Sequence, residues 1–267
     1  MVNYINYFGF TAEPFPAVID MKKVYVYKEL QDLVERFKYT ADTGMVSLIT
    51  GQVGAGKTTS LKYACEQFHP SKYKIIPVIA NTGSMLEILR QITLAFNMEC
   101  STNSITFLIK NIRERIKEIF SKRQTPILVI DEANLIRERI FQELHNILQY
   151  DFESSQIMPL VLAGQVSLID KLKFHTAQSL ASRVAGRSHL EGLDIKGMKN
   201  YINHHLSVSG MSDELFNEGA VLAIHQGSGG IMRKANNLAR GALVAASARN
   251  SKLISAEHVR LAQTELL

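Results

Sequence analysis

The sequence predicts an α/β domain built on a parallel sheet, followed by a small all-helical domain. Short apolar runs alternate with segments in which apolar residues recur every three or four positions, and from about Asp194 only the helical pattern continues. Because strands that alternate with helices pair in parallel through right-handed crossovers, we expect an α/β domain over residues 1–193. The helical domain then covers residues 194–267.

The strands are expected where a run is short, rich in β-branched residues and bounded by turn residues, as in strands buried on both faces. Four runs meet this description: 45–50, 74–81, 126–133 and 158–165. Helical spacing predicts four helices in the first domain: 58–68, 84–96, 104–122 and 137–152. The second domain is expected to hold helices over 195–208, 214–226, 230–248 and 255–266.

The composition is that of an ordinary globular protein, with 46% hydrophobic and 21% charged residues among 267. No segment has the roughly 18 consecutive apolar residues of a membrane span, and the first residues do not resemble a signal peptide. Cys65 and Cys100 have no metal or redox spacing, which favours a reducing compartment. We therefore expect a cytoplasmic protein without a membrane span.

The formal net charge is +5, and lysine and arginine outnumber acidic residues by four within residues 110–123. Such an excess is typical of a solvated helix face, and it also suits an acidic partner such as nucleic acid. Charge alone does not decide between these interpretations.

A glycine-rich turn lies between the first expected strand and the helix that follows it. Residues 51–58 fit the pattern G-x-x-x-x-G-K-[ST], in which backbone amides wrap phosphates and the helix N-terminus adds positive dipole. Lys57 is expected to reach the outer phosphates, and Thr58 to hold Mg²⁺. The residues expected to bind the nucleotide here are Gly51, Gln52, Val53, Gly54, Ala55, Gly56, Lys57, Thr58 and Thr59.

Two adjacent carboxylates close the third expected strand. Asp131 follows four apolar residues and can bind the nucleotide's Mg²⁺ through water, and Glu132 is a candidate base for the attacking water. Neighbouring side chains on a strand point to opposite faces, so the two carboxylates are expected to have different roles. The alternative is that both charges only open the next helix. No guanine-binding N-K-x-D pattern is present, which favours ATP over GTP.

The order of these motifs resembles that of AAA+ ATPases. It is similar to the ExeA-like ATPases in particular, which themselves resemble the transposition regulators TnsC and MuB. The similarity extends over nearly the whole chain and implies a phosphate-loop AAA+ sheet flanked by helices with a helical lid. The segments that carry it are YINYFGFTAEPFPAVID, GQVGAGKTT, VIDEAN, VLAGQVSLID, SLASRV and GGIMRKANNLARGALVAA.

The resemblance implies roles for three further polar residues. Gln165, at the end of the fourth strand, would be the sensor that touches the γ-phosphate or the attacking water, unless it is simply a turn residue. Arg183 resembles the arginine finger that one subunit donates to the site of the next, and Arg187 is its rival for that role. Arg233 matches the second sensor at the start of a lid helix, where Lys234 is a neighbour that could take its place.

Three other features complete the expectations from the sequence. Asn81 is either a polar switch that holds Glu132 away from water, as the resemblance implies, or a helix N-cap. The pair Gly229 and Gly230 is expected to give the lid helix a flexible start. The aromatic residues near the N-terminus either cover the adenine or pack in a core: Tyr4, Tyr7, Phe8, Phe15, Tyr25 and Tyr27.

The resemblance also implies that ATP holds subunits together in a ring or filament, and it leaves two clients open. The first is double-stranded DNA, bound without sequence preference alongside a transposase or similar protein. The second is an ExeA-like role in a secretion or assembly system. Because the sequence ends at Leu267, directly after the expected lid, we favour DNA. Its contacts are expected at 81–86 and 101–107, where Ser84 and Ser104 would cap two helices.

Overall fold

The computed structural model describes residues 4–81, 84–148, 158–212 and 214–265. Within these ranges the chain forms one parallel sheet of five strands in the order β2-β3-β4-β1-β5. The predicted fold class, a parallel sheet flanked by helices and followed by a helical domain, is confirmed. The strands are β1 (Val46–Gly51), β2 (Tyr73–Ile79), β3 (Thr125–Asp131), β4 (Leu160–Gly164) and β5 (Val184–Leu190).

Strand β5 is absent from the expectations, because its sequence VAGRSHL contains no apolar run. It lies at one edge of the sheet, beside β1, and its residues alternate between buried and solvent-accessible positions. A strand with one open face needs only every second residue to be apolar or small. A search for continuous apolar runs therefore cannot find it.

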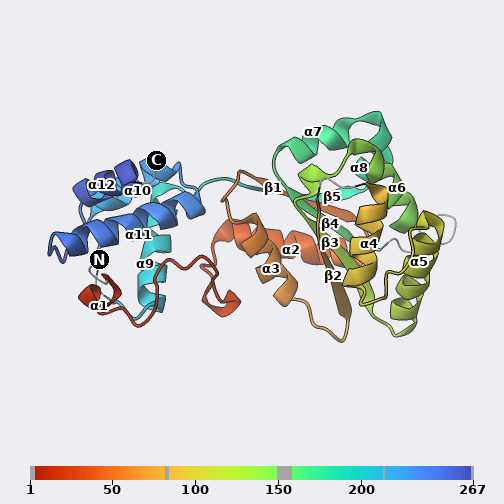
Figure 1. The fold of residues 1–267 in the computed structure, drawn as a ribbon, viewed down its shortest axis with the longest axis horizontal. Coiled ribbons are helices and arrows are strands. Elements are labelled where there is room, and N and C mark those ends of the chain that lie inside the picture. The colour runs from red at the N-terminus through yellow and green to blue at the C-terminus, as the bar shows by residue number, and fades with distance from the viewer. Residues whose placement is uncertain (1–3, 82–83, 149–157, 213, 266–267) are drawn as a thin grey trace. The chain divides into compact units, whose positions relative to one another are not determined.

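Helices cover both faces of the sheet (Figure 1). α2 and α3 pack against the face of β1, β4 and β5, and α4 and α5 pack against the opposite face at β2 and β3. α2 is not among the expected helices, and the predicted helix 137–152 extends beyond the described residues. The helices that belong with the sheet are α2 (Lys28–Thr43), α3 (Lys57–Glu66), α4 (Met85–Ala95), α5 (Ile105–Ser121), α6 (Glu138–Leu148), α7 (Ser167–Lys173) and α8 (Gln178–Ala181).

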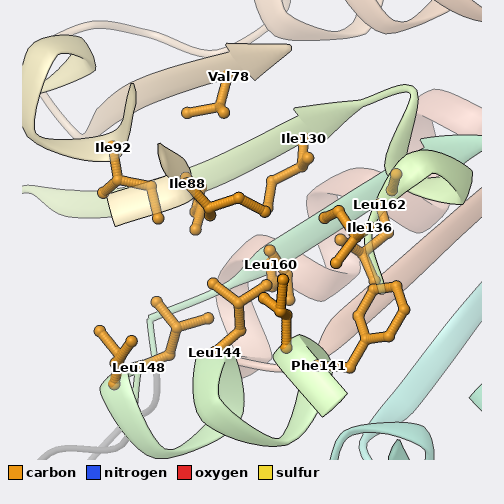
Figure 2. Close-up of a cluster of buried hydrophobic side chains, with 14 of the residues drawn as sticks. Val78, Ile88, Ile92, Ile130, Ile136, Phe141, Leu144, Leu148, Leu160 and Leu162 are labelled. Carbon is orange, nitrogen blue, oxygen red and sulfur yellow. The ribbon is translucent and has the colours of Figure 1, made fainter. Parts of the chain in front are cut away.

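The main core lies on the α4 and α5 face of the sheet. Alternate residues of the strands point into it, such as Leu128 and Ile130 on β3, while Ile127 and Val129 are buried on the other face. Figure 2 shows strand side chains meeting side chains of α4 and α6: Ile130, Leu160, Leu162, Ile88, Ile92, Phe141 and Leu144. Burial on both faces keeps the carboxyl ends of the central strands in fixed register.

The helical unit contains α9 (Ile195–Val208), α10 (Glu218–Ser228), α11 (Met232–Ala248) and α12 (Ala256–Glu265). These match the four helices expected after Asp194. They belong to a compact unit made of three parts of the chain: the amino-terminal segment up to Tyr27, residues Gln52–Gly56, and the residues from Glu191 onward. The segment carries a short helix, α1 (Tyr4–Phe8), and a single 3-10 turn (Met21–Lys23).

This grouping differs from the domain limits that the sequence predicts, which place residues 1–27 in the α/β domain. The physical reason is aromatic burial, because Phe8, Phe10 and Phe15 lie in one apolar cluster with residues of α9, α10 and α11. Polar contacts add to it: Thr11 donates to the Ser209 carbonyl at 2.9 Å, and His205 bonds the Pro14 carbonyl at 2.7 Å. For Phe8 and Phe15, core packing is therefore the correct alternative.

Within the part of the chain that the structure describes, no helix combines the length and the hydropathy that crossing a bilayer requires.

A candidate site for nucleotide binding and hydrolysis

The phosphate loop, residues 51–58, connects the end of β1 to the start of α3. Gly54 and Gly56 have φ angles of +85° and +88°, in the left-handed region that favours glycine. Lys57 is the first residue of α3 and is only 6% exposed. Its ammonium group donates to the Gly51 carbonyl at 3.0 Å, so a buried positive charge is held inside the loop. Thr59 is half-buried in the first turn of α3.

Arg233, near the start of α11, lies against this loop. Its backbone N–H donates to the Gly54 carbonyl at 3.1 Å, and a Cβ added at Gly54 would stand 2.8 Å from the Arg233 Cβ. Arg233 therefore contacts Gly54, which belongs to the same compact unit, and its role as the second sensor stays a prediction. The side chains of Arg233 and Lys234 are both exposed.

Thr58 and Asp131 meet across the site. The Thr58 hydroxyl donates to one oxygen of the Asp131 carboxylate at 2.7 Å. Asp131 is the last residue of β3 and is 8% exposed. A hydroxyl and a carboxylate are both hard oxygen ligands, the kind that Mg²⁺ prefers in proteins. The donor set that the sequence predicts for the metal is thus brought together and fits it.

Glu132 corrects part of the sequence argument. The two carboxylates were expected to point to opposite faces of one strand, but β3 ends at Asp131. Glu132 lies beyond the strand and has a left-handed backbone with φ 54° and ψ 31°. Its N–H donates to the other Asp131 carboxylate oxygen at 2.9 Å. The left-handed backbone of Glu132, rather than alternation along a strand, therefore sets the directions of the two side chains. The carboxylate of Glu132 is half-buried, and strained residues of this kind cluster at functional sites.

Gln165 directly follows β4, which pairs with β3 through residues such as Ile130 and Leu162. Its side chain is exposed, and its backbone N–H donates to the Asn134 side-chain oxygen at 2.8 Å. No role for Asn134 was among the expectations from the sequence. The signal was present in the segment VIDEAN, because a polar residue so soon after a buried strand lies at the same edge as the carboxylates.

The two arginines proposed as fingers lie on or next to β5. The Arg183 carbonyl accepts from the N–H of Val46, at the start of β1, so Arg183 lies at the opposite end of β1 from Gly51. Five residues at about 3.3 Å each separate those ends by roughly 16 Å. Arg187 is exposed within β5, beside Leu48.

The polar residue after β2 is placed near the end of β3. The Ala80 N–H donates to the Asp131 carbonyl at 2.8 Å, and Asn81 is the next residue. The N-cap of α4 is Ser84, so the N-cap interpretation of Asn81 is wrong. The polar-switch interpretation stays a prediction.

The segments expected to contact DNA are described in part, because residues 82–83 lie outside the described ranges. Ser104 caps α5, where its hydroxyl accepts from the Phe107 N–H at 3.4 Å, whereas Ser84 makes no side-chain capping bond. Three basic residues of α5 and its C-cap form ion pairs with acids of the same helix: Lys110 with Glu114, and Arg115 and the C-cap Lys122 with Glu118. These pairs leave the net charge of the segment unchanged but reduce the number of unpaired cations.

Comparison with known proteins now adds to this geometry. Residues 40–172, which include the phosphate loop, both carboxylates and Gln165, match the family described as the AAA domain. Over 265 residues the chain is 26% identical to general secretion pathway protein A of Aeromonas hydrophila, covering 98% of this chain and 48% of that protein. The chain thus spans about half the length of this curated relative.

Solved structures share the AAA+ fold. The TM-score is 0.70 to the Aeropyrum pernix ORC2 protein in its ADPNP-ADP complexes, at 17% identity over 95% of this chain and 71% of that one. It is also 0.70 to a Drosophila ORC chain in a structure bound to DNA, at 16% identity over 98% and 65%. It is 0.57 to the RuvB Holliday junction branch migration motor of Thermotoga maritima, at 18% identity over 96% and 74%. At such identities the likeness shows the fold alone.

Proposed function

We propose that this chain is an ATPase whose nucleotide state controls an assembly of its own subunits on double-stranded DNA. The observation that carries the proposed hydrolysis is the 2.7 Å hydrogen bond from the Thr58 hydroxyl to the Asp131 carboxylate. Thr58 is the second residue of α3, directly after the buried Lys57. An AAA domain implies nucleotide binding, and this arrangement supports ATP with Mg²⁺ as the substrate pair.

The mechanism assigns one task to each side chain. Lys57, which donates to the Gly51 carbonyl without nucleotide, would donate to outer phosphate oxygens, and Thr58 and Asp131 would hold Mg²⁺, directly or through water. Bound Mg²⁺ supplies positive charge that offsets the charge of the phosphoryl group in the transition state. Glu132 takes a proton from the attacking water as its oxygen bonds to the γ-phosphorus and the bond to the ADP oxygen breaks. Gln165 orients the same water.

The position of Arg183 supports the proposed self-association. An arginine roughly a strand length from Gly51 along β1 cannot reach the phosphates bound by its own loop. A neighbouring subunit can present the same arginine to that site. Hydrolysis then depends on assembly, and Arg233 would report the nucleotide state to the helical unit.

Two findings support different clients. AAA+ neighbours in fold include a chain of the Drosophila ORC in a structure bound to DNA and the Thermotoga maritima RuvB branch migration motor, which support DNA as the client. The relative of Aeromonas hydrophila is named for general secretion, which supports the secretion-like alternative. The relation to TnsC and MuB, and with it a role in transposition, stays a prediction.

The hydrolytic proposal is tested by phosphate release from ATP and Mg²⁺ and by nucleotide titration. Lys57→Ala should abolish nucleotide binding, because the loop loses the charge that neutralises the phosphates. Lys62→Ala removes an exposed lysine from the same helix and serves as the matched control. Equal nucleotide affinity of the two variants would contradict the assignment of the loop.

The DNA proposal is tested by fluorescence anisotropy on several unrelated duplexes with a non-hydrolysable ATP analogue. We expect binding that requires the analogue, is equal among sequences and weakens steeply with salt, because backbone phosphates would be contacted. Absence of binding at low salt would remove DNA as the client and favour the secretion-like alternative. Strong preference for one duplex would contradict binding through the backbone.

A further inference from the structure

Asn134 joins the two turns that carry Glu132 and Gln165. It lies in a 3-10 helix of one turn, Ala133–Leu135, that follows β3, and it is 7% exposed. Its side-chain oxygen accepts the backbone N–H of Gln165 at 2.8 Å, so the partner requires an acceptor at this atom. The contact therefore links the end of β3 to the residue that follows β4.

Gly164 makes room for this contact. A Cβ added at Gly164 would stand 2.6 Å from the Asn134 side-chain oxygen and 2.9 Å from its backbone nitrogen. Real side chains do not approach so closely, and the turn would have to shift. Its φ is not in the left-handed region, so close approach rather than backbone conformation requires the glycine.

The turn that carries Asn134 is itself held at both ends. The Leu135 N–H donates to the Glu132 carbonyl at 2.8 Å, and the Lys171 ammonium of α7 donates to the Ile136 carbonyl at 2.8 Å. Glu132 is thus fixed in its left-handed conformation two residues before Asn134. A shift of Asn134 relative to Gln165 would change the spacing of the proposed base and the proposed sensor.

We propose that Asn134 is a positioning residue that sets the placement of Gln165 relative to Glu132. The inference rests on the proposed function, because it assigns Glu132 and Gln165 to the same water. Asn134 itself does not touch the substrate. Misplacement of reacting groups by about 1 Å can lower a rate by roughly a hundredfold.

The first experiment compares steady-state hydrolysis of wild type and Asn134→Ala. We expect kcat to fall at least about tenfold with KM within about twofold, since nucleotide contacts are kept while alignment is lost. Gly164→Ala should act in the same direction by displacing Asn134. Asn217→Ala is the matched control, because that side chain also accepts one backbone N–H at 2.8 Å, at the N-cap of α10. It should leave kcat unchanged.

The second experiment follows amide hydrogen exchange at Gln165 in the full chain without nucleotide. Exchange should accelerate at least about tenfold in Asn134→Ala and stay slow in Asn134→Asp, which keeps an acceptor oxygen. A wild-type kcat in Asn134→Ala, or unchanged exchange at Gln165, would overturn the inference. Absence of hydrolysis by the wild type would instead contradict the proposed function, and the exchange measurement would still test the Asn134 contact.

Discussion

Glu132 combines a left-handed backbone with a half-buried carboxylate at the end of a buried strand. An L-residue in this conformation costs roughly 1–2 kcal/mol, so the surrounding bonds must hold it there. The Asp131 carboxylate does so through the Glu132 N–H, and the same carboxylate accepts the Thr58 hydroxyl. One side chain therefore sets both the proposed metal position and the direction of the proposed base.

Replacing Glu132 by Gln should leave nucleotide affinity unchanged and slow hydrolysis at least about a hundredfold, because only the base is removed. Phosphate release and nucleotide titration measure the two effects separately. Glu138→Gln is the matched control, since Glu138 is a half-buried acid at the start of α6, outside the proposed site. Turnover of the Glu132→Gln protein near the wild-type rate would assign the base elsewhere.

At the scale of elements, the turn between α10 and α11 packs against the chain just before α9. Gly229 ends α10 with a left-handed backbone, and Gly230 follows with φ +77°. Leu193 and Gly230 exchange close backbone contacts, including a 2.9 Å bond from the Leu193 N–H to the Gly230 carbonyl. Gly230 therefore serves a close approach of two backbone segments, whereas an added Cβ at Gly229 would meet no atom within 4 Å. The flexible start that the sequence suggests stays a prediction.

Gly230→Ala should destabilise the helical unit by at least about 2 kcal/mol, because an added Cβ would stand 2.4 Å from the Leu193 carbonyl oxygen and the backbone must move. Gly229→Ala is the matched control, since it also has positive φ but no neighbouring atom within 4 Å of the added Cβ. It should cost only about 1 kcal/mol. Urea unfolding followed by circular dichroism compares them, and equal losses would show that the close approach is unimportant.

His205 ties the amino-terminal segment to α9. Its ring stacks on Phe15 with centroids 5.4 Å apart and lies against Tyr201 and His204. Burial lowers the pKa of His205 to about 4, although its bond to the Pro14 carbonyl opposes the shift. The folded state therefore binds this proton less readily than the unfolded chain, whose histidine pKa is about 6.5.

Stability should consequently fall as the pH drops from about 6.5 towards 4, since the unfolded state then binds more protons. Between pH 7 and 5, His205 alone should account for about 2 kcal/mol of lost stability. Urea unfolding at the two pH values should show a smaller loss for His205→Asn than for the wild type. The same loss in both proteins would mean that other groups, such as His258, whose pKa is also lowered by burial, dominate.

At the scale of the whole molecule, the proposed function requires a group that one chain does not place at its own site. Lys57, Thr58, Asp131 and Glu132 belong to one loop edge of the sheet, whereas Arg183 lies at the other end of β1. Phosphoryl transfer gains from an additional positive charge near the transferred group. A second copy of the chain is the natural source of that charge under the proposed function.

Mixing Arg183→Ala with Lys57→Ala should restore hydrolysis that neither protein has by itself, because each supplies what the other lacks at a mixed interface. Phosphate release at increasing total concentration measures the effect. Arg260→Ala is the matched control, because Arg260 is an exposed arginine of α12 with no proposed role in the site. Normal hydrolysis by Arg183→Ala alone would contradict its role and make Arg187 the next residue to test.

The sequence by itself determined the phosphate loop, the carboxylate pair, the strands β1 to β4 with most of the helices around them, and the fold class. These depend on residues close together in the chain: the glycines and Lys57 share one turn, and the helical and strand periods are local. The apolar runs of β1, β3 and β4 also predict burial on both faces, which fixes a central position in the sheet.

Only the tertiary structure decided which distant segments meet. Asn134 and Gln165 are brought together by the pairing of β3 with β4, and His205 and Phe15 by the packing of the amino-terminal segment on α9. Long-range contacts also decide two other features. They place β5 at the edge of the sheet, and they group the residues before Lys28 with the helical unit. Burial of apolar surface is not directional, so a sequence indicates which residues become buried but not which partners bury them.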